Sequence, residues 1–333
     1  MRTFLQESIS KNDLEDIFRV NKLGKIIDYK MVGGGEFNTI YFVQTTNGKF
    51  IIKIAPSCNK KCMRHEQGIL SNEVEVYIKL QKYGVKVPKI FAYSVSEDNI
   101  FNYLIMEYVV GSKFNKLKFS SQEKLKLYYN LGKELAKIHG IKSNEGFGFA
   151  HIGLCQTWKE AYLKMVSMVQ LDAEEFNIEI PYRQEISTII KKLECFFDDV
   201  KEAQLVHGDM WGGNIIFANK ELCFIDCERA YYGDVVSDFL LLNINGKYDD
   251  PYYQQLLKGY NEISSRKIEY NQNFIIRSEL MKLYFGLVLY TEVYYRYPIN
   301  SITFKSKQIY AKRFLKNTIN FLQNFNEENH EYI

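Results

Sequence analysis

The segment LVHGDMWGGNIIF, residues 205–217, sets three polar side chains close to the core of the protein. His207, Asp209 and Asn214 lie within eight residues of one another, between apolar flanks. The run that ends the segment is rich in isoleucine and phenylalanine, which is typical of a β-strand. Three polar side chains so close to an apolar core suggest a function, and the residues that follow in the sequence indicate which one.

A second apolar run, LCFID at residues 222–226, follows the first after a turn near Asn219. The two runs predict a β-hairpin, and a hairpin brings its two ends together, so we expect Asp226 close to Asn214. Carboxylate and amide oxygens are ligands that magnesium takes in proteins, and Asp209 lies just upstream. Asp and Asn also form turns and cap strands, which is the commoner role of each taken alone. The spacing of the set favours a magnesium site.

Upstream of this segment, residues 26–55 predict three strands. Three consecutive glycines separate the first strand from the second, and Asn47-Gly48 between alternating apolar residues predicts a tight hairpin. Residues 70–84 have helical spacing and end at a glycine, and residues 102–109 predict another strand. The first part of the chain therefore predicts a small sheet with one main helix.

After Gly111 the pattern becomes helical. Ser120 with Glu123 has the spacing of a capping box and predicts a helix that ends at His139. Further helical spacing follows at residues 157–170, 184–200, 273–296 and 306–325. We therefore predict an α+β protein with two domains, residues 1–110 and residues 111–333, the second mostly helical with the hairpin embedded in it.

Composition fits a globular protein. The chain has 333 residues, 46% hydrophobic, and 43 basic against 40 acidic side chains, so its charge indicates neither nucleic acid nor a membrane surface as partner. It has no apolar stretch long enough to span a bilayer and no secretory signal pattern at its start, and its six cysteines lack the spacing of a zinc site. A cytoplasmic protein with reduced cysteines is expected.

The spacing H-x-D-x-x-x-x-N, followed by an Asp after a hairpin, resembles the catalytic and metal-binding segments of the protein-kinase-like fold. The other parts of that fold occur in the same order: GGGEFNT at 33–39, Lys53 in FIIKIAP, Glu73 in NEVEVYIKL and IMEYVVG at 105–111. The Gly run alone, or the Lys alone, would be weak, because a flexible turn and an edge strand carry such residues too. The resemblance implies a bilobal fold with a small antiparallel-sheet N-lobe and a larger, mostly helical C-lobe.

The details favour one branch of this fold. HGD stands where protein kinases have an Arg in the middle position, and Asp226 is followed by Cys-Glu, so the DFG triplet is absent. LGKELAKIHG, GFGFAHIGLCQTWKEAYLKMV and IDCERAYYGDVVSDFLLL are similar to segments of the aminoglycoside phosphotransferase family of small-molecule kinases. HGDMWGGN and YYGD are also similar to the fructosamine kinases, although KIAP and IDCER fit that branch less well.

The resemblance implies a role for each matching residue. Asp209 is expected to orient the acceptor hydroxyl and take its proton, and magnesium is expected on Asn214 and Asp226. The phosphate donor, ATP or GTP, is expected to contact Lys53, which is expected to pair with Glu73. The backbone of Gly34 and Gly35 is expected to approach the phosphates. The backbone of Glu107 and Val109 is expected to contact the purine, with Met106 behind it.

Four more residues are expected to support the site. His207 is expected to brace the catalytic loop by hydrogen bonding, since imidazole more often supports such a site than reacts in it. Asp234 and Asp238 are expected to cap the next helix and tie the loop down. For Glu228 two interpretations stay open, contact with the substrate or simple solvation.

The acceptor is the least determined part. Aminoglycosides are polycations, and LDAEEFNIEI at residues 171–180, with Asp249-Asp250, offers carboxylates for one, although acidic runs are usually solvated surface. We therefore expect an aminoglycoside-type antibiotic or similar amino-sugar as the small-molecule hydroxyl acceptor. The alternatives are a metabolite kinase acting on a fructosamine, choline or a thiosugar, and a catalytically silent kinase-like binding module. Retention of the charged residues argues against a silent module, because buried charges are costly.

Overall fold

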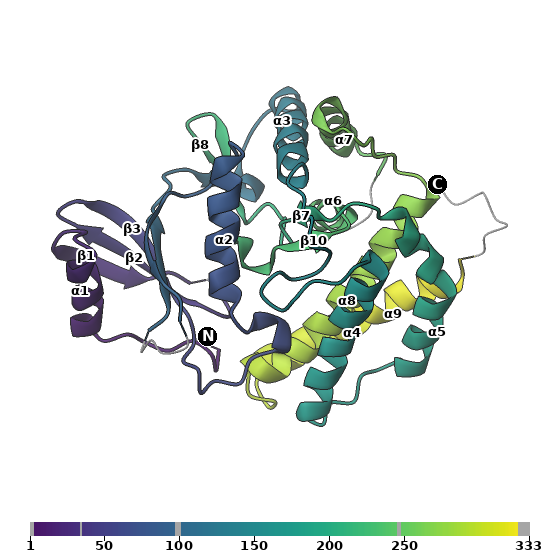
Figure 1. The fold of residues 1–333 in the computed structure, drawn as a ribbon, viewed down its shortest axis with the longest axis horizontal. Coiled ribbons are helices and arrows are strands. Elements are labelled where there is room, and N and C mark those ends of the chain that lie inside the picture. The colour runs from purple at the N-terminus through teal and green to yellow at the C-terminus, as the bar shows by residue number, and fades with distance from the viewer. Residues whose placement is uncertain (1–2, 34, 97–100, 245–247, 326–333) are drawn as a thin grey trace. The chain divides into compact units, whose positions relative to one another are not determined.

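A computed structural model describes residues 3–33, 35–96, 101–244 and 248–325 (Figure 1). The chain forms two compact units. The first combines residues within Met1–Cys62, Glu66–Lys118 and Trp211–Ala230, and the second combines residues within Met63–His65, Phe119–Met210 and Tyr231–Ile333. Residues 211–230 thus group with the N-terminal part of the chain. The predicted division at residue 110 places them in the helical domain instead.

The first unit is built on a five-stranded antiparallel sheet in the order β1-β2-β3-β5-β4. The prediction of three strands in residues 26–55 is confirmed. The hairpin between the second and third is also present, but its two-residue turn is Thr46-Asn47, one residue earlier than predicted. The strands are β1 (Ile26–Met31), β2 (Thr39–Thr45), β3 (Gly48–Ile54), β4 (Ile90–Ser94) and β5 (Tyr103–Glu107).

Two α-helices pack in the described residues of this unit. The predicted helix is α2 (Ile69–Lys82), and α1 (Lys11–Val20) lies beside the sheet at the purple end of the chain (Figure 1). Leu14 and Phe18 of α1 are fully buried in a cluster with residues of β2 and β3, and the rings of Phe18 and Phe50 meet edge to face with centroids 5.7 Å apart. The N-terminal helix therefore belongs to the core of the first unit.

The predicted hairpin is present and forms a small sheet in the order β6-β8-β9. Its strands are β6 (Ser112–Lys113), β8 (Ile215–Ala218) and β9 (Glu221–Phe224), with short 3-10 turns η2 (Phe114–Lys116) and η4 (Cys227–Arg229) nearby. Asn219 and Lys220 both have positive φ, of 50° and 67°, which is the conformation of a tight type I′ turn. Gly111 allows β8 to approach, because a Cβ there would lie 2.5 Å from the carbonyl oxygen of Phe217.

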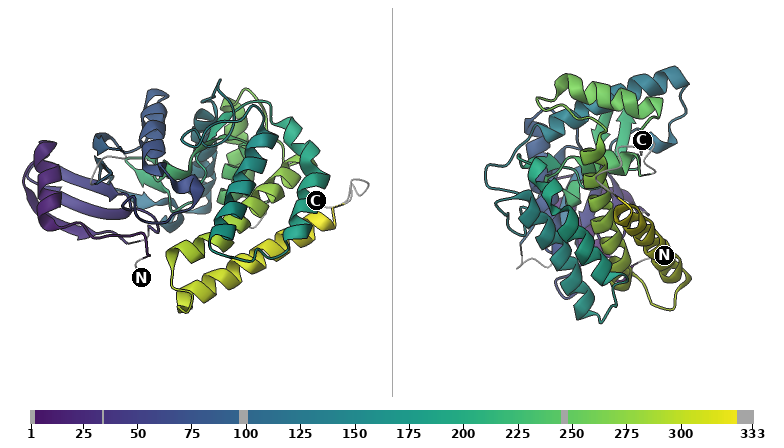
Figure 2. Two further views of the ribbon diagram at one scale, coloured as in Figure 1. Left: turned by 60° about the horizontal axis from the view of Figure 1, so that its bottom comes forward. Right: turned by 90° about the vertical axis from the view of Figure 1, so that its right-hand side faces the viewer.

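The second unit is mostly helical, as predicted. Its helices are α3 (Ser121–His139), α4 (Trp158–Glu175), α5 (Arg183–Leu193), α6 (Val236–Leu242), α7 (Pro251–Ile263), α8 (Gln272–Arg296) and α9 (Ile302–Gln323). Figure 2 shows α8 and α9 running along each other. The predicted capping box at Ser120 is present at the start of α3. The helix expected over 184–200 ends at Leu193 and continues as the 3-10 turn η3 (Glu194–Asp199).

A short two-stranded ladder completes the second unit. In it β7 (Gln204–Val206) pairs antiparallel with β10 (Tyr231–Gly233), so the strand that leads into the HGD segment is held by the segment that follows the hairpin. The 3-10 turn η1 (Arg64–Glu66) precedes α2. Within the described ranges, no helix combines the length and apolar character needed to cross a bilayer.

Candidate active site

A buried lysine on β3 organises the candidate site of the first unit. Lys53 and the carboxylate of Glu73 on α2 form the predicted ion pair, with the ammonium nitrogen 2.7 Å and 2.8 Å from the two oxygens. The two side chains are 6% and 0% exposed. Lys53 is 4% exposed, and it points to the face of β3 opposite to that of its neighbours Ile52 and Ile54, which are buried in the cluster with α1.

Two more carboxylates approach the same ammonium group. Asp226 lies 2.6 Å from the nitrogen of Lys53, and Glu228 lies 3.9 Å from it. One oxygen of each of Glu73, Asp226 and Glu228 lies within 4.8 Å of the others. Both Asp226 and Glu228 come from the segment after the hairpin, so this segment and α2 together surround Lys53 with negative charge.

The charges shift the ionisation of the groups in this cluster. Burial alone would lower the pKa of Lys53, but the carboxylates of Asp226, Glu73 and Glu228 outweigh it and hold the pKa well above its ordinary value. Burial, with repulsion from Asp226, raises the pKa of Glu228 to about 8. The side chain of Glu228 is 15% exposed, so it is largely buried rather than simply solvated. Burial also raises the pKa of Glu73, against the effect of Lys53.

The backbone of Asp226 adopts a left-handed conformation, with φ 65° and ψ 51°. Such a conformation costs a non-glycine residue free energy and needs support from its surroundings. The backbone N–H of Asp226 donates to the hydroxyl of Tyr77 at 2.9 Å. The amide of Asn72 donates to the carbonyl oxygens of Glu228 and Ala230, at 3.0 Å and 2.9 Å.

Tyr77 and Asn72 are site residues that the sequence did not indicate. Both are buried on α2, and Tyr77 lies four residues after Glu73, which puts the two on one face of the helix. That spacing was the available signal, but a buried tyrosine at a helical position is usually part of the core. Only the return of the distant segment 226–230 onto α2 gives it a role.

Asn214 lies at the other end of the hairpin. Its carbonyl accepts from the N–H of Ile225 at 2.9 Å, and Ile215 pairs with Phe224 in the ladder. Asn214 is thus joined by its backbone to the residue that precedes Asp226. The predicted hairpin therefore brings the segments of the two expected metal ligands together, and the role of each as a ligand stays a prediction.

The glycine-rich turn between β1 and β2 contacts the carboxylate cluster through Asn38. The side-chain nitrogen of this buried residue donates to the carboxylate of Glu228 at 2.7 Å, while its side-chain oxygen is buried without a hydrogen-bond partner. Gly35 lies on this turn, with Ile40 and the carbonyl of Asn38 within 3.3 Å of an added Cβ. Gly34 lies outside the described residues.

The strand expected to meet the purine is β5 and the residues after it. Met106 is 3% exposed and Glu107 is exposed. The backbone N–H of Glu107 donates to the carbonyl of Lys89 at 2.8 Å, so this N–H already has a partner. Val109 follows the strand and is partly buried. Purine contacts by these residues stay a prediction.

In the second unit, Asp238 on α6 holds the HGD segment. Its carboxylate accepts from the backbone N–H groups of His207 and Gly208, at 2.8 Å and 3.1 Å. The N–H of Asp209 donates to the ring nitrogen Nδ1 of His207 at 3.3 Å. The carboxylate of Asp238 also lies 3.1 Å from His139. These hydrogen bonds join His207 and Asp238 to the HGD segment, and support of a catalytic loop by the two residues stays a prediction; Asp238 lies within α6 rather than capping it.

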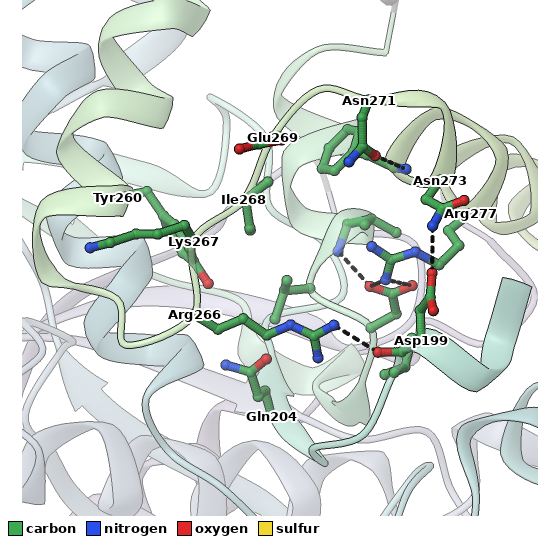
Figure 3. A pocket seen from close by; sticks show the side chains of 15 residues that line it. Asp199, Gln204, Tyr260, Arg266, Lys267, Ile268, Glu269, Asn271, Asn273 and Arg277 are labelled. Carbon is green, nitrogen blue, oxygen red and sulfur yellow. Dashed lines mark hydrogen bonds and ion pairs between the residues drawn. The ribbon is translucent and has the colours of Figure 1, made fainter.

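Asp234 forms an ion pair. One guanidinium nitrogen of Arg277 lies 2.7 Å from both carboxylate oxygens of Asp234, and the N–H of Val236 at the start of α6 donates to one of them at 3.2 Å. Asp234 lines a pocket of about 160 Å³ in the second unit (Figure 3). The pocket has three basic and three acidic side chains, so its charge favours neither an anion nor a cation: Arg266, Lys267, Arg277, Asp199, Asp234 and Glu269.

The acidic segment 171–180 is only partly a surface run. Asp172 is fully buried and forms an ion pair with Arg64, and Glu174 pairs with Arg183 at 2.8 Å. Tyr295 donates to the carbonyl of Asp172 at 3.0 Å. These carboxylates have partners within the second unit, which weakens the idea that they collect a polycationic acceptor.

Comparison with known proteins adds a family. The model of the phosphotransferase enzyme family matches residues 28–269 of this chain. A probable ketoamine kinase of Staphylococcus aureus is 21% identical over 282 residues, which cover 78% of this chain and 89% of the relative.

Two solved structures have similar folds. A putative fructosamine-3-kinase from Thermobifida fusca superposes with a TM-score of 0.66 at 17% identity, covering 92% of this chain and 100% of the other. The ADP-bound aminoglycoside phosphotransferase APH(2'')-Ib superposes with a TM-score of 0.62 at 20% identity, covering 93% of this chain and 99% of the other. These likenesses confirm the predicted kinase-like α+β fold.

Proposed function

This chain belongs to the phosphotransferase enzyme family, and from that premise we propose that it transfers the γ-phosphate of ATP to a hydroxyl of a small molecule with the help of magnesium. The family confirms the prediction that the chain is a phosphotransferase. The donor, the metal and the acceptor are the parts proposed here. A cytoplasmic location also stays a prediction.

The observation that carries the proposal is the cluster around Lys53. Three carboxylates and one ammonium group share a small, largely buried volume, and even with Glu228 protonated the carboxylates of Glu73 and Asp226 outnumber the one ammonium group. Buried charge without compensation is unfavourable. A bound divalent cation would compensate it, and we propose that binding of magnesium with the triphosphate does so.

The donor atoms fit magnesium. Asp226, one of the three carboxylates, and Asn214 both offer oxygen, as magnesium requires, and the cation keeps several waters that donate hydrogen bonds. The side-chain oxygen of Asn38 is a buried acceptor without a partner beside this cluster, which suits such a water. Asn214 and Asp226 would hold the ion, which would neutralise charge on the phosphates, while Lys53, fixed by Glu73, would bind the phosphate oxygens.

Asp209 is proposed to orient the acceptor hydroxyl and accept its proton. Its loop is fixed by hydrogen bonds to the Asp238 carboxylate and by the N–H of Asp209 on the ring of His207. A fixed carboxylate suits this reaction, because phosphoryl transfer depends mainly on positioning and on charge stabilisation.

For the acceptor we propose a sugar that carries an amine, and a ketoamine of the fructosamine type in particular. The support is the similarity to a probable ketoamine kinase and to a putative fructosamine-3-kinase. An aminoglycoside is the second candidate, supported by the fold shared with an aminoglycoside phosphotransferase. The pairing of Asp172 and Glu174 with arginines makes the second candidate the weaker one.

An acceptor panel tests this proposal. ADP release is measured with magnesium and ATP or GTP, in the presence of a fructosamine, an aminoglycoside, choline or no acceptor. We expect turnover with the fructosamine and ATP, and loss of turnover without magnesium. Product phosphorylation is confirmed by mass spectrometry. Absence of turnover with every acceptor, by a folded protein that also fails to bind ATP, would favour the silent binding module instead.

Two variants separate the proposed roles. Asp209→Asn should bind magnesium ATP normally in calorimetry, while turnover falls about a hundredfold or more, because the group that handles the acceptor proton is lost. Asp226→Ala should weaken binding of ATP only when magnesium is present. Normal turnover in Asp209→Asn would contradict the role of Asp209 at the acceptor hydroxyl. Unchanged magnesium-dependent affinity for ATP in Asp226→Ala would contradict the role of Asp226 as a metal ligand.

A further inference from the structure

The segment before α1 lies against the glycine-rich turn of the first unit. The hydroxyl of Thr3 donates to the carbonyl of Glu36 at 2.8 Å. The side-chain nitrogen of Gln6 donates to the carbonyls of Gly35 and Asn38, at 2.8 Å and 3.3 Å. Three carbonyl groups of one short turn are thus bound by two side chains near the start of the chain.

This segment is anchored by apolar packing as well. Leu5 is 1% exposed and packs in a small cluster with Phe37 of the turn and Ile69 at the start of α2. Segments near chain ends are often poorly ordered unless they are tied down, and here both hydrogen bonds and a buried leucine tie this one down. We refer to residues 3–6 as the N-terminal strap.

The strap determines which way the turn's peptide groups face. In a trans peptide unit the carbonyl oxygen and the N–H of the next residue point in opposite directions. Because the carbonyls of Gly35 and Glu36 face the strap, the N–H groups of Glu36 and Phe37 point to the side away from it. Backbone N–H groups presented together in a turn are the kind of donors that bind phosphate oxygens.

A second contact fixes the other end of the turn. Asn38 accepts from Gln6 through its backbone carbonyl and donates through its side chain to Glu228, which lies 3.9 Å from Lys53. Gln6, Asn38 and Glu228 therefore connect the strap to the carboxylate cluster by consecutive hydrogen bonds. The turn is held at both ends by side chains outside it.

We propose that the N-terminal strap is a positioning element for the nucleotide: by binding the carbonyls of the turn, Thr3 and Gln6 hold its N–H groups in the orientation that receives the phosphates of ATP. This role rests on the proposed function, because it assumes that the turn covers the phosphates. It gives the first residues of the chain a part in the affinity for nucleotide without any contact to the reacting atoms.

Gln6→Met tests the proposal, because methionine has similar length and volume but cannot donate a hydrogen bond. We expect the dissociation constant and the KM for magnesium ATP to rise about fivefold, the size of a lost hydrogen bond, while kcat at saturating ATP stays the same. In the protein without nucleotide, amide hydrogen exchange over residues 35–38 should become faster. Thr3→Val should change the same quantities in the same direction.

The matched control is Glu7→Gln. Glu7 belongs to the same N-terminal segment, but its carboxylate accepts from the N–H of Ser57 and pairs with Lys60, not with the turn. This variant should keep wild-type affinity and exchange. If thermal melting shows that wild type and Gln6→Met are both folded and the two bind ATP with equal affinity, the proposed role of the strap is overturned. A wild-type protein that binds no ATP would overturn the proposed function and this role with it.

Discussion

At the scale of single residues, the conformation of Asp226 is the feature that most needs support. A carboxylate in a left-handed backbone conformation sits against a buried ammonium group, and the hydroxyl of Tyr77 accepts its N–H. Burial and the nearby Glu73 raise the pKa of Tyr77 well above its ordinary value, so this hydroxyl stays protonated and can donate as well as accept. Tyr77 thus ties the proposed metal ligand to the helix that carries Glu73.

Tyr77→Phe should therefore disturb the site more than the fold. The change removes the acceptor of the Asp226 N–H and leaves that group without its partner, which costs about 1–3 kcal/mol. We expect kcat/KM for ATP to fall about tenfold, the equivalent of about 1.4 kcal/mol, with the circular dichroism spectrum unchanged.

Tyr83→Phe is the control for that measurement, because it makes the same chemical change at the exposed C-terminal end of α2. It should behave like the wild type. A Tyr77→Phe protein with wild-type kinetics would show that the Asp226 conformation does not need this hydroxyl.

At the scale of elements, the crossing of α3 and α7 depends on two glycines. A Cβ at Gly132 would lie 2.0 Å from the carbonyl oxygen of Leu256, and a Cβ at Gly259 would lie 1.9 Å from that of Tyr129. Both would meet backbone rather than a flexible side chain, so the helices would have to move apart. This close crossing holds α3, whose last residue His139 contacts Asp238, in the second unit.

Gly259→Ala should lower the free energy of unfolding by about 1–3 kcal/mol, because the added methyl group has no space at the crossing. Alanine has a higher helix propensity than glycine, so by propensity alone the change would raise stability. A lower free energy of unfolding therefore reports the clash between the two helices. Denaturant unfolding followed by circular dichroism measures it. The neighbouring exposed Lys258→Ala should change stability by less than about 0.5 kcal/mol. A Gly259→Ala protein as stable as the wild type would contradict the tight crossing.

At the scale of the whole molecule, the first unit is assembled from segments far apart in the sequence. The hairpin and η4 reach it after a long excursion of the chain through helices of the second unit. Phe224 is fully buried and its N–H donates to the carbonyl of Lys86, while Asn72 binds the backbone after Asp226. The first unit is therefore incomplete without residues 211–230.

A fragment of residues 1–118 should consequently not fold cooperatively by itself. It lacks Phe224 and Glu228, whose backbone groups bind Lys86 and Asn72. Of the three carboxylates in the cluster around Lys53, the fragment keeps that of Glu73 and loses those of Asp226 and Glu228. We expect no sharp thermal transition by calorimetry. A fusion in which a flexible linker joins residue 118 to residues 211–230 should regain one. A cooperative transition in the short fragment alone would contradict this view of the unit.

The sequence predicted much of the fold and part of the site. The strands of residues 26–55, the capping box at Ser120 and the hairpin of 215–224 follow from local rules of periodicity, capping and turns, and all are present. The ion pair of Lys53 and Glu73 was expected from the resemblance to kinases and is present. The strand β4 and the helix α7 were not predicted from the sequence.

Local features follow from the sequence: which residues alternate along strands, where helices are capped, and which polar residues stand beside apolar runs. Which distant groups meet depends on how the chain folds in three dimensions. Tyr77, Asn72 and Gln6 gain their roles because chain segments far from them return to their side chains. Hydrogen bonds and charge interactions act over a few ångströms in space, regardless of separation in sequence, so the distant partners of these side chains cannot be read from local spacing along the chain.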